Sequence, residues 1–258
     1  GFVSIKPYKD GFFSTWLDGR NTSSSKEQSG HASGPMSLRS AIINSEGEII
    51  EESEIDNMVC DCCQTSLTVS DNIPIVVYRD RTKNEIRDIS VSRFINSSWT
   101  NSYSLNDDNW KINGCPVNGP YIDSKGKNVA VAWFSAAGGN PQVSVKFSNN
   151  QGKSFGEKIL INDLNTIPLG RVDLDFINQR SVVVSWLSTN KGVGSINLRK
   201  IDMNGNMGEI VSLSNVSSSR ATGFPQLERL KNDIFLSWTD EMNGIKKIKT
   251  FKLPISSL

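Results

Sequence analysis

The sequence predicts an all-β fold, and three observations lead to this prediction. Short apolar runs recur along the 258 residues, they end near an aromatic residue, and polar turn residues separate them. No run has the apolar spacing of an amphipathic helix. The aromatic residues recur about every fifty to sixty residues, which fits one four-stranded propeller blade. These marker residues are Trp16, Tyr78, Trp133, Trp186 and Trp238.

Five such repeats predict five blades of a β-propeller, in a single domain that covers residues 1–258. One strand is expected before each marker strand, and in most blades two follow it. The polar stretch 21–34 is expected to form a long loop. The approximate blades are 1–56, 57–107, 108–163, 164–214 and 215–258, the marker strands are 11–18, 73–80, 128–134, 181–187 and 233–240, and the other strands of the second blade are 65–69, 87–94 and 99–105.

The charge balance excludes some partners. There are 28 Lys and Arg residues against 27 Asp and Glu residues, and no block of like charges occurs. Nucleic acid is therefore not an expected partner. The longest apolar runs, such as 129–134, have the length of a strand, so we expect no transmembrane segment.

Three of the four cysteines fall within four positions, in the run that starts at Cys60. If the run is extended, Cys60 and Cys62 point to one side of the strand and Cys63 to the other. In an exported protein, Cys62 or Cys63 could then form a disulfide with Cys115 in the next blade.

The alternative is a site for copper(I) or zinc, formed by Cys60, Cys62, Cys63 and Cys115, since thiolates are ligands for soft metal ions. His31, the only histidine, is a further candidate ligand, although a histidine in a Gly/Ser-rich loop is more often solvated. Taken as C-x-C-C, the run does not match a zinc knuckle or a thioredoxin motif, so neither function is specified.

A propeller brings the starts of its first strands and the ends of its second strands to one mouth of its channel, where a pocket is expected. The arginines predicted there could clamp an anionic ligand, or they could pair with neighbouring aspartates. Two of the carboxylates could serve a glycosidase, whereas the aromatic residues could stack on a sugar or fill the core. The ligand-binding candidates are Arg20, Arg39, Arg79, Arg81, Arg171, Asn118 and Gln64, with Arg87 as a further clamp residue; the catalytic candidates are Asp18, Asp80, Asp173 and Asp240; Asp88 is a further pairing candidate; and the aromatic candidates are Trp110 and Phe224.

The segment 148–155 resembles the Asp-box of sialidases and related BNR-repeat proteins, S-x-D-x-G-x-T-W, with Asn for Asp, Ser for Thr and Phe for Trp. That family places the motif in the turn between the third and fourth strands of a blade. There a side-chain acceptor ties the turn amides, Gly takes a positive φ and the aromatic residue plugs the blade. The residues that match are Ser148, Asn150, Gly152, Ser154 and Phe155.

The whole chain resembles a sialidase-like propeller of exported bacterial proteins, through runs such as LDGR, GPMSLR, CDCCQT, YRDR, GCPVNGP and LGRVD. This resemblance implies six blades, so an N-terminal portion is expected to be missing, and it implies an extracytoplasmic location. The chain lacks the Phe/Tyr-Arg-Ile-Pro motif and a Tyr/Glu nucleophile pair, so sialic acid hydrolysis is not carried over.

We therefore expect an exported propeller that binds a glycan or a small anionic ligand at the mouth lined by cysteines and arginines. Three alternatives remain open. They are a glycoside hydrolase of the sialidase superfamily, a copper- or zinc-binding propeller, and a structural module that docks a protein partner.

Overall fold

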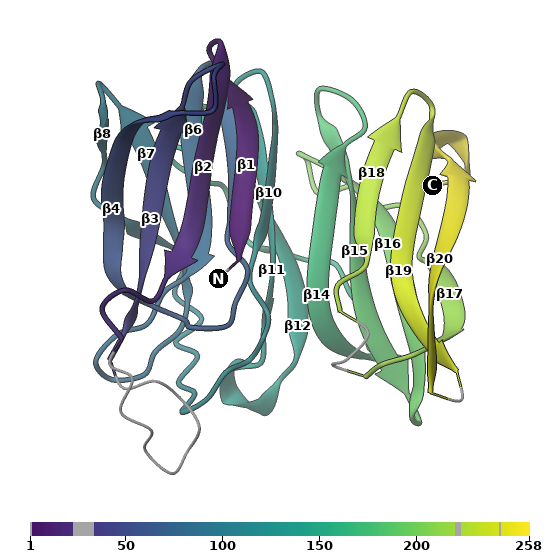
Figure 1. Ribbon diagram of the computed structural model, residues 1–258. Coiled ribbons are helices and arrows are strands. Elements are labelled where there is room, and N and C mark those ends of the chain that lie inside the picture. Colours follow the sequence, from purple (N-terminus) through teal and green to yellow (C-terminus); the bar gives the residue numbers. More distant parts are fainter. Residues whose placement is uncertain (1, 23–33, 220–222, 243) are drawn as a thin grey trace. The chain divides into compact units, whose positions relative to one another are not determined.

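The computed structural model describes residues 2–22, 34–219, 223–242 and 244–258. Over these residues nearly all of the regular secondary structure is strand, and the strands form five antiparallel sheets (Figure 1). The only helical elements described are the short 3₁₀ turns η1 (Ala137–Gly139) and η3 (Ile255–Ser257). The predicted all-β class and the five repeats are confirmed. The contacts divide the chain into unit 1, Gly1–Pro120, and unit 2, Tyr121–Leu258, and each unit is described by itself.

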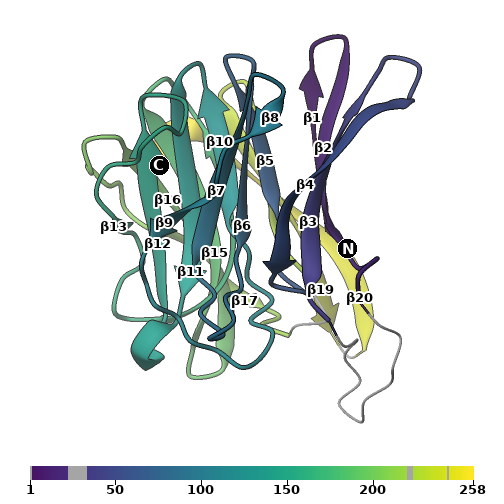
Figure 2. The same ribbon diagram turned by 90° about the vertical axis from the view of Figure 1, so that its left-hand side faces the viewer.

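Unit 1 contains two sheets. In the first, four strands follow one another in chain order, as Figure 1 shows. In the second, the predicted strand 99–105 is divided into two short strands that both pair with β7 (Figure 2). The first sheet comprises β1 (Val3–Tyr8), β2 (Gly11–Asp18), β3 (Met36–Ile43) and β4 (Ile49–Val59), and the second comprises β5 (Ser66–Ser70), β6 (Ile73–Arg79), β7 (Ile89–Ile95), β8 (Ser98–Trp99) and β9 (Tyr103–Asn106).

Unit 2 contains three sheets, again with neighbouring strands in chain order. The segment that resembles an Asp-box joins the third and fourth strands of the first of these sheets, as predicted. The strands are β10 (Tyr121–Lys125), β11 (Asn128–Ser135), β12 (Gln142–Ser148) and β13 (Ile159–Leu160); β14 (Ile167–Phe176), β15 (Ser181–Asn190), β16 (Val193–Asp202) and β17 (Val211–Val216); and β18 (Gln226–Leu230), β19 (Asp233–Met242) and β20 (Ile245–Pro254).

The second strand of a sheet supplies much of the core. Strands β6, β11 and β15 bury almost every residue, which explains why they appear in the sequence as continuous apolar runs rather than alternating ones. In unit 1, Phe13 makes edge-to-face contacts with Phe94 and Trp99, with ring centroids 5.1 and 5.6 Å apart. These contacts join β2 of the first sheet to β7 and β8 of the second.

Candidate functional site

The cysteine run lies in a turn that joins the two sheets of unit 1. Val59, the last residue of β4, forms a bridge with Asp80, and the backbone N–H of Cys60 donates to the carbonyl of Arg79 at 3.0 Å. The chain then turns at residues 61–63, and β5 begins only at Ser66. The run is therefore a turn and not the extended segment on which the predicted directions of the cysteines depend. Because the chain turns, Cys60 and Cys63 converge instead of pointing to opposite sides.

The four cysteines form two pairs. Cys62 and Cys115 form a disulfide with Cα atoms 6.1 Å apart, so the predicted link to Cys115 is confirmed for Cys62. Cys60 and Cys63 carry no disulfide, are each 1% exposed, and have their Sγ atoms 2.6 Å apart. The sulfur atoms of Cys60, Cys62 and Cys63 all lie within 4.8 Å of one another.

The pairing of Cys60 with Cys63 changes how the motif should be described. These residues enclose two others, Asp61 and Cys62, which is C-x-x-C spacing. The prediction that described the run only as C-x-C-C overlooked this spacing. Of the three clustered cysteines, the outer two therefore form the thiol pair and the middle one forms the disulfide.

Arg87 is in direct contact with this thiol pair. Its Nη1 lies 3.5 Å from Sγ of Cys60, and its Nη2 lies 2.8 Å from a carboxylate oxygen of Glu85. The hydrogen bond from Cys63 lowers the pKa of Cys60 to about 6; the amide of Cys62 and the guanidinium of Arg87 act in the same direction, against the effect of burial. Burial and the anionic Cys60 raise the pKa of Cys63. The pair therefore carries one thiolate and one thiol near neutral pH.

A second arginine, Arg79, is buried behind the pair. Its Nε donates to the carbonyl of Asn118 and its Nη1 to the carbonyl of Arg87, both at 2.6 Å. Its guanidinium lies 4.8 Å from the ring centroid of Trp110, which is 7% exposed. Trp110 therefore fills the core beside a cation instead of offering a free face to a sugar. We call Cys60, Cys63, Arg79 and Arg87 the thiol–arginine cluster.

Gln64 and Gly119 fasten the loop that carries Cys115. The side chain of Gln64 accepts a hydrogen bond from the amide of Gly119 at 2.8 Å and donates one to its carbonyl at 3.3 Å. A Cβ on residue 119 would lie 1.9 Å from the carbonyl oxygen of Gln64, so only glycine allows this approach. Gln64 and Asn118, predicted to bind a ligand, thus make contacts that hold the loop.

The other arginines predicted for unit 1 are paired with carboxylates. Arg20 binds Asp18 through two nitrogens at 3.0 and 2.8 Å and also contacts Glu52 at 2.9 Å. Arg39 pairs with Glu52 and Glu54, and Arg81 pairs with Glu85 and Asp61. Most of these partners are glutamates, which the sequence did not single out. An anionic ligand would have to compete with them.

The aspartates proposed for catalysis are also engaged. In unit 1, the paired Arg20 holds the pKa of Asp18 well below its usual range, and Asp80, whose pKa is raised by burial, accepts from Ser90 at 3.2 Å. In unit 2, Asp173 accepts the amides of Leu174 and Leu227, and Asp240 lies 2.5 Å from Nζ of Lys249. Burial raises the pKa of Asp173 to about 8. A catalytic pair stays a prediction.

Arg171 and Phe224 lie together in unit 2. Nη1 of Arg171 donates to the carbonyls of Ser219 and Gly223 at 3.0 and 2.9 Å, and its guanidinium lies 5.8 Å from the ring centroid of Phe224. Arg171 therefore binds the backbone at Ser219 and at Gly223, ahead of β18. The predicted common channel mouth, which would join residues of both units, stays a prediction.

The turn at 148–155 has the hydrogen bonds that its sequence predicts. Oγ of Ser148 accepts from the amide of Gly152 at 3.0 Å, and Oδ1 of Asn150 accepts from the amide of Ser154 at 3.0 Å. Gly152 has a φ of 68°. Phe155, expected to plug the blade, is only partly buried, whereas Phe147 is 7% exposed.

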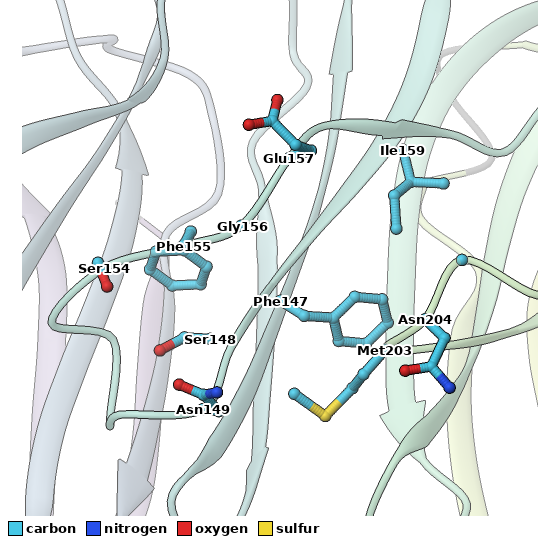
Figure 3. A pocket seen from close by; sticks show the side chains of 11 residues that line it. Phe147, Ser148, Asn149, Ser154, Phe155, Gly156, Glu157, Ile159, Met203 and Asn204 are labelled. Carbon is cyan, nitrogen blue, oxygen red and sulfur yellow. The ribbon is translucent and has the colours of Figure 1, made fainter.

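Phe147 and Phe155 line a pocket of about 490 Å³ in unit 2. Figure 3 shows Ser154 and Phe155 on one side of it, and Met203 and Asn204 on the other. Its lining combines aromatic rings with amide side chains and one carboxylate, a mixture that suits a small polar ligand. The sequence pattern of this turn predicts a structural role only, and the pocket is not apparent from it. The remaining lining residues are Ser148, Asn149, Gly156, Glu157, Ile159 and Gly205.

His31, the candidate metal ligand, lies outside the described residues. Within the described part of the chain, no helix has the length and apolar character needed to cross a membrane.

No protein-family model matches the sequence, and no curated protein matches it. Solved structures do resemble it. A protein of unknown function from Dyadobacter fermentans is 11% identical, with a TM-score of 0.54, over 97% of this chain and 93% of that one. The endosialidase of phage phi92 is 12% identical, with a TM-score of 0.55, over 98% of this chain and 51% of that one, so the chain spans about half the length of that enzyme.

At these identities the likeness concerns the fold alone. Together with the five antiparallel sheets, it gives the chain a β-propeller fold. The narrower name of BNR-repeat protein is not supported by any family match; the structure shows a turn at 148–155 that the side chains of Ser148 and Asn150 hold by hydrogen bonds.

Proposed function

We propose that the chain binds one soft metal ion, copper(I), through the thiolates of Cys60 and Cys63. The observation that carries this proposal is the pair of adjacent buried thiols outside any disulfide, whose sulfur atoms would move apart to admit the ion. Thiolates favour copper(I) among the biological metal ions. A buried pair flanked by guanidinium groups also suits an ion that leaves the bis-thiolate complex with one net negative charge.

Copper(I) fits this site better than zinc does. A structural zinc site needs four ligands, usually Cys or His. Among the described residues, the clustered candidates are Cys60, Cys62 and Cys63, and the disulfide occupies Cys62. Only two thiols therefore remain for a metal ion, which is too few for a closed zinc site.

The proposal is tested by titrating the protein that has Cys60 and Cys63 as thiols with copper(I) under anaerobic conditions. A chromophoric chelator that competes for copper(I) reports the affinity. We expect one tightly bound ion per chain, at least a hundredfold weaker binding in Cys60→Ser and in Cys63→Ser, and unchanged binding in His31→Ala. Retention of tight binding by Cys60→Ser would exclude the site. Loss of binding in His31→Ala would replace the two-thiolate site with one that includes the histidine.

A carbohydrate ligand is the second candidate, and the pocket beside Phe155 favours it. A partly buried aromatic ring can stack on a sugar while Asn149 and Asn204 hydrogen-bond its hydroxyls. Because Glu157 also lines the pocket, we propose a neutral sugar rather than an anionic one.

Binding to a panel of neutral and sialylated glycans tests this candidate. Phe155→Ala should weaken binding at least tenfold, whereas Phe235→Ala, a control at another partly exposed phenylalanine of unit 2, should leave it unchanged. Release of reducing sugar from any glycan in the panel would favour the glycosidase alternative. If no glycan binds, the carbohydrate candidate fails, and the docking module remains as the alternative.

We further propose an extracytoplasmic location, because a disulfide such as Cys62–Cys115 persists mainly in oxidising compartments. Fractionation of cells that produce the full-length protein, followed by thiol labelling of each fraction, would test this. A cytoplasmic pool with Cys62 reduced would contradict it.

A further inference from the structure

In unit 1, a pair of cysteine thiols lies next to a cysteine disulfide. Cys60 and Cys63 are buried thiols, whereas Cys62 and Cys115 form a disulfide, and both of these residues are partly exposed. Sγ of Cys62, one of the two disulfide sulfurs, lies within 4.8 Å of both thiol sulfurs. A buried dithiol is therefore adjacent to a disulfide that solvent can reach.

We propose that the four cysteines form an internal thiol–disulfide exchange relay. In the relay, the dithiol of Cys60 and Cys63 reduces the disulfide of Cys62 and Cys115. The product has a buried Cys60–Cys63 disulfide and two partly exposed thiols, at Cys62 and Cys115. This activity belongs to the metal-free protein and goes beyond the proposed metal binding.

Each step conserves atoms and electrons. The Cys60 thiolate attacks Sγ of Cys62; the Cys62–Cys115 bond breaks, and its electron pair leaves on Cys115, which takes up a proton from solvent. Cys63 then gives up its proton and attacks Sγ of Cys60; the Cys60–Cys62 bond breaks, and Cys62 leaves as a thiolate and takes up a proton. One dithiol is oxidised and one disulfide is reduced, so no outside oxidant is needed.

The geometry around Cys60 supports its role as the attacking group. The guanidinium of Arg87, 3.5 Å from Sγ, stabilises a thiolate there. Cys63 is well placed for the second step, because its sulfur lies 2.6 Å from that of Cys60 and a disulfide bond needs a separation of about 2.05 Å. The turn at 61–63 already holds the two residues together.

The burial pattern assigns different roles to the two pairs. An outside dithiol or disulfide can reach Cys62 and Cys115, which are partly exposed, but not Cys60 and Cys63, which are 1% exposed. The partly exposed pair would therefore exchange with a partner, and the buried pair would store the two electrons. The chemical class of partner is a thiol or a disulfide of another molecule.

Alkylation of the native protein tests the relay. The full chain is purified without reductant, freed of metal with a chelator and incubated with N-ethylmaleimide; the labelled cysteines are then mapped by mass spectrometry over time. We expect label to accumulate on Cys62 and Cys115 while Cys60 and Cys63 become linked. In a control sample, the protein is quenched with acid and denatured before labelling. At time zero this sample should carry label on Cys60 and Cys63 instead.

Two variants separate the steps. Cys63→Ser stops the relay after the first step, so only Cys115 should be labelled in the native protein. Cys60→Ser removes the attacking group, so native labelling of Cys62 and Cys115 should fall at least tenfold.

Three results would overturn the relay. These are a native chain with two disulfides and no thiol, label confined to Cys60 and Cys63, or no label on Cys62 and Cys115 after prolonged incubation. All three results can be observed in the labelling time course of the wild-type protein, so the test holds even if a variant fails to fold. A chain that exchanges but binds no copper(I) contradicts the metal site alone, and a chain that binds copper(I) without exchanging contradicts the relay alone.

Discussion

The guanidinium of Arg87 lies 3.5 Å from the sulfur of Cys60, so a buried cation touches a buried thiol in unit 1. This contact is one of the causes that hold the pKa of Cys60 at about 6. We expect Arg87→Gln to raise that pKa by about one unit, because a neutral amide cannot stabilise the thiolate as a cation does. Titration of thiolate absorbance in the metal-free protein measures the change.

Arg81→Gln is the matched control, since Arg81 shares the partner Glu85 with Arg87 and has the carboxylate of Asp61, not a thiol, as its other ion-pair partner. Its titration should match that of the wild type. If the pKa of Cys60 shifts equally in both variants, it is controlled by the loss of positive charge near Glu85 and not by the contact between Arg87 and sulfur.

Gly119 is expected to be intolerant of substitution. In Gly119→Ala, the new Cβ would lie 1.9 Å from the carbonyl oxygen of Gln64, so the backbone must move. We expect the free energy of unfolding to fall by about 3 kcal/mol or more. Gly114→Ala is the control in the same loop: its Cβ would meet no atom within 4 Å, and its stability should change by at most about 1 kcal/mol. Urea unfolding compares the two, and similar losses would contradict the close approach.

Ser148 should contribute measurably to the stability of unit 2. Its hydroxyl accepts from the amides of Asn150 and Gly152, and it is buried. Ser148→Ala leaves both amides without this acceptor, so we expect a loss of about 1–3 kcal/mol. Asn149→Ala, at an exposed neighbour, should change stability by less than about 0.5 kcal/mol. Thermal unfolding of both variants under the same conditions measures the difference in stability. If the two variants are equally stable, the turn has no structural role.

The buried Asp173 predicts a pH dependence of stability. Its pKa is about 8 in the folded protein, against an ordinary value of about 3.9, so the folded state binds the proton more tightly than the unfolded state does. The contribution of Asp173 to stability should therefore be greatest below pH 4 and decline as the pH rises from about 4 to about 8. Asp173→Asn should flatten this decline, measured as the urea midpoint at each pH.

Asp107→Asn, at an exposed site, is the control and should keep the wild-type slope. Part of the decline should remain in Asp173→Asn. Burial, together with the neighbouring Asp123, raises the pKa of Asp175 to about 7, and this acts with the same sign. A wild-type midpoint that rises steadily from pH 5 to pH 8 would contradict the raised pKa values.

The fold could be predicted because its strands follow local rules. The marker strand at 11–18 coincides with β2, and the one at 73–80 nearly coincides with β6, since apolar runs bounded by turn residues specify both. The break between β8 and β9 could not be predicted in this way. It depends on how Phe94 pairs with Trp99 and Val91 with Tyr103, which are contacts between segments and not properties of either one.

The site was only partly predictable. A link from Cys62 or Cys63 to Cys115 could be expected from their place in consecutive repeats, but the choice of Cys62 and the convergence of Cys60 and Cys63 depend on the turn at 61–63, which an extended run does not have. Their C-x-x-C spacing was visible in the sequence and could have indicated it. The glutamate partners of Arg39 and Arg81 depend on the register of β3 with β4 and on the 80–88 turn, which the sequence alone does not specify.

The double hydrogen bond between Gln64 and Gly119 has a consequence for the chemistry of Cys115. It holds the loop independently of the disulfide, so Cys115 should remain near Cys62 after the bridge opens. A thiol tethered in this way reacts at an effective concentration in the millimolar range or above, far higher than that of an outside thiol in dilute solution. In the Cys60–Cys62 mixed disulfide, attack of Cys115 on Cys62, with Cys60 as the leaving group, would then outpace attack by weak external thiols, and only a strongly reactive partner would intercept the open form.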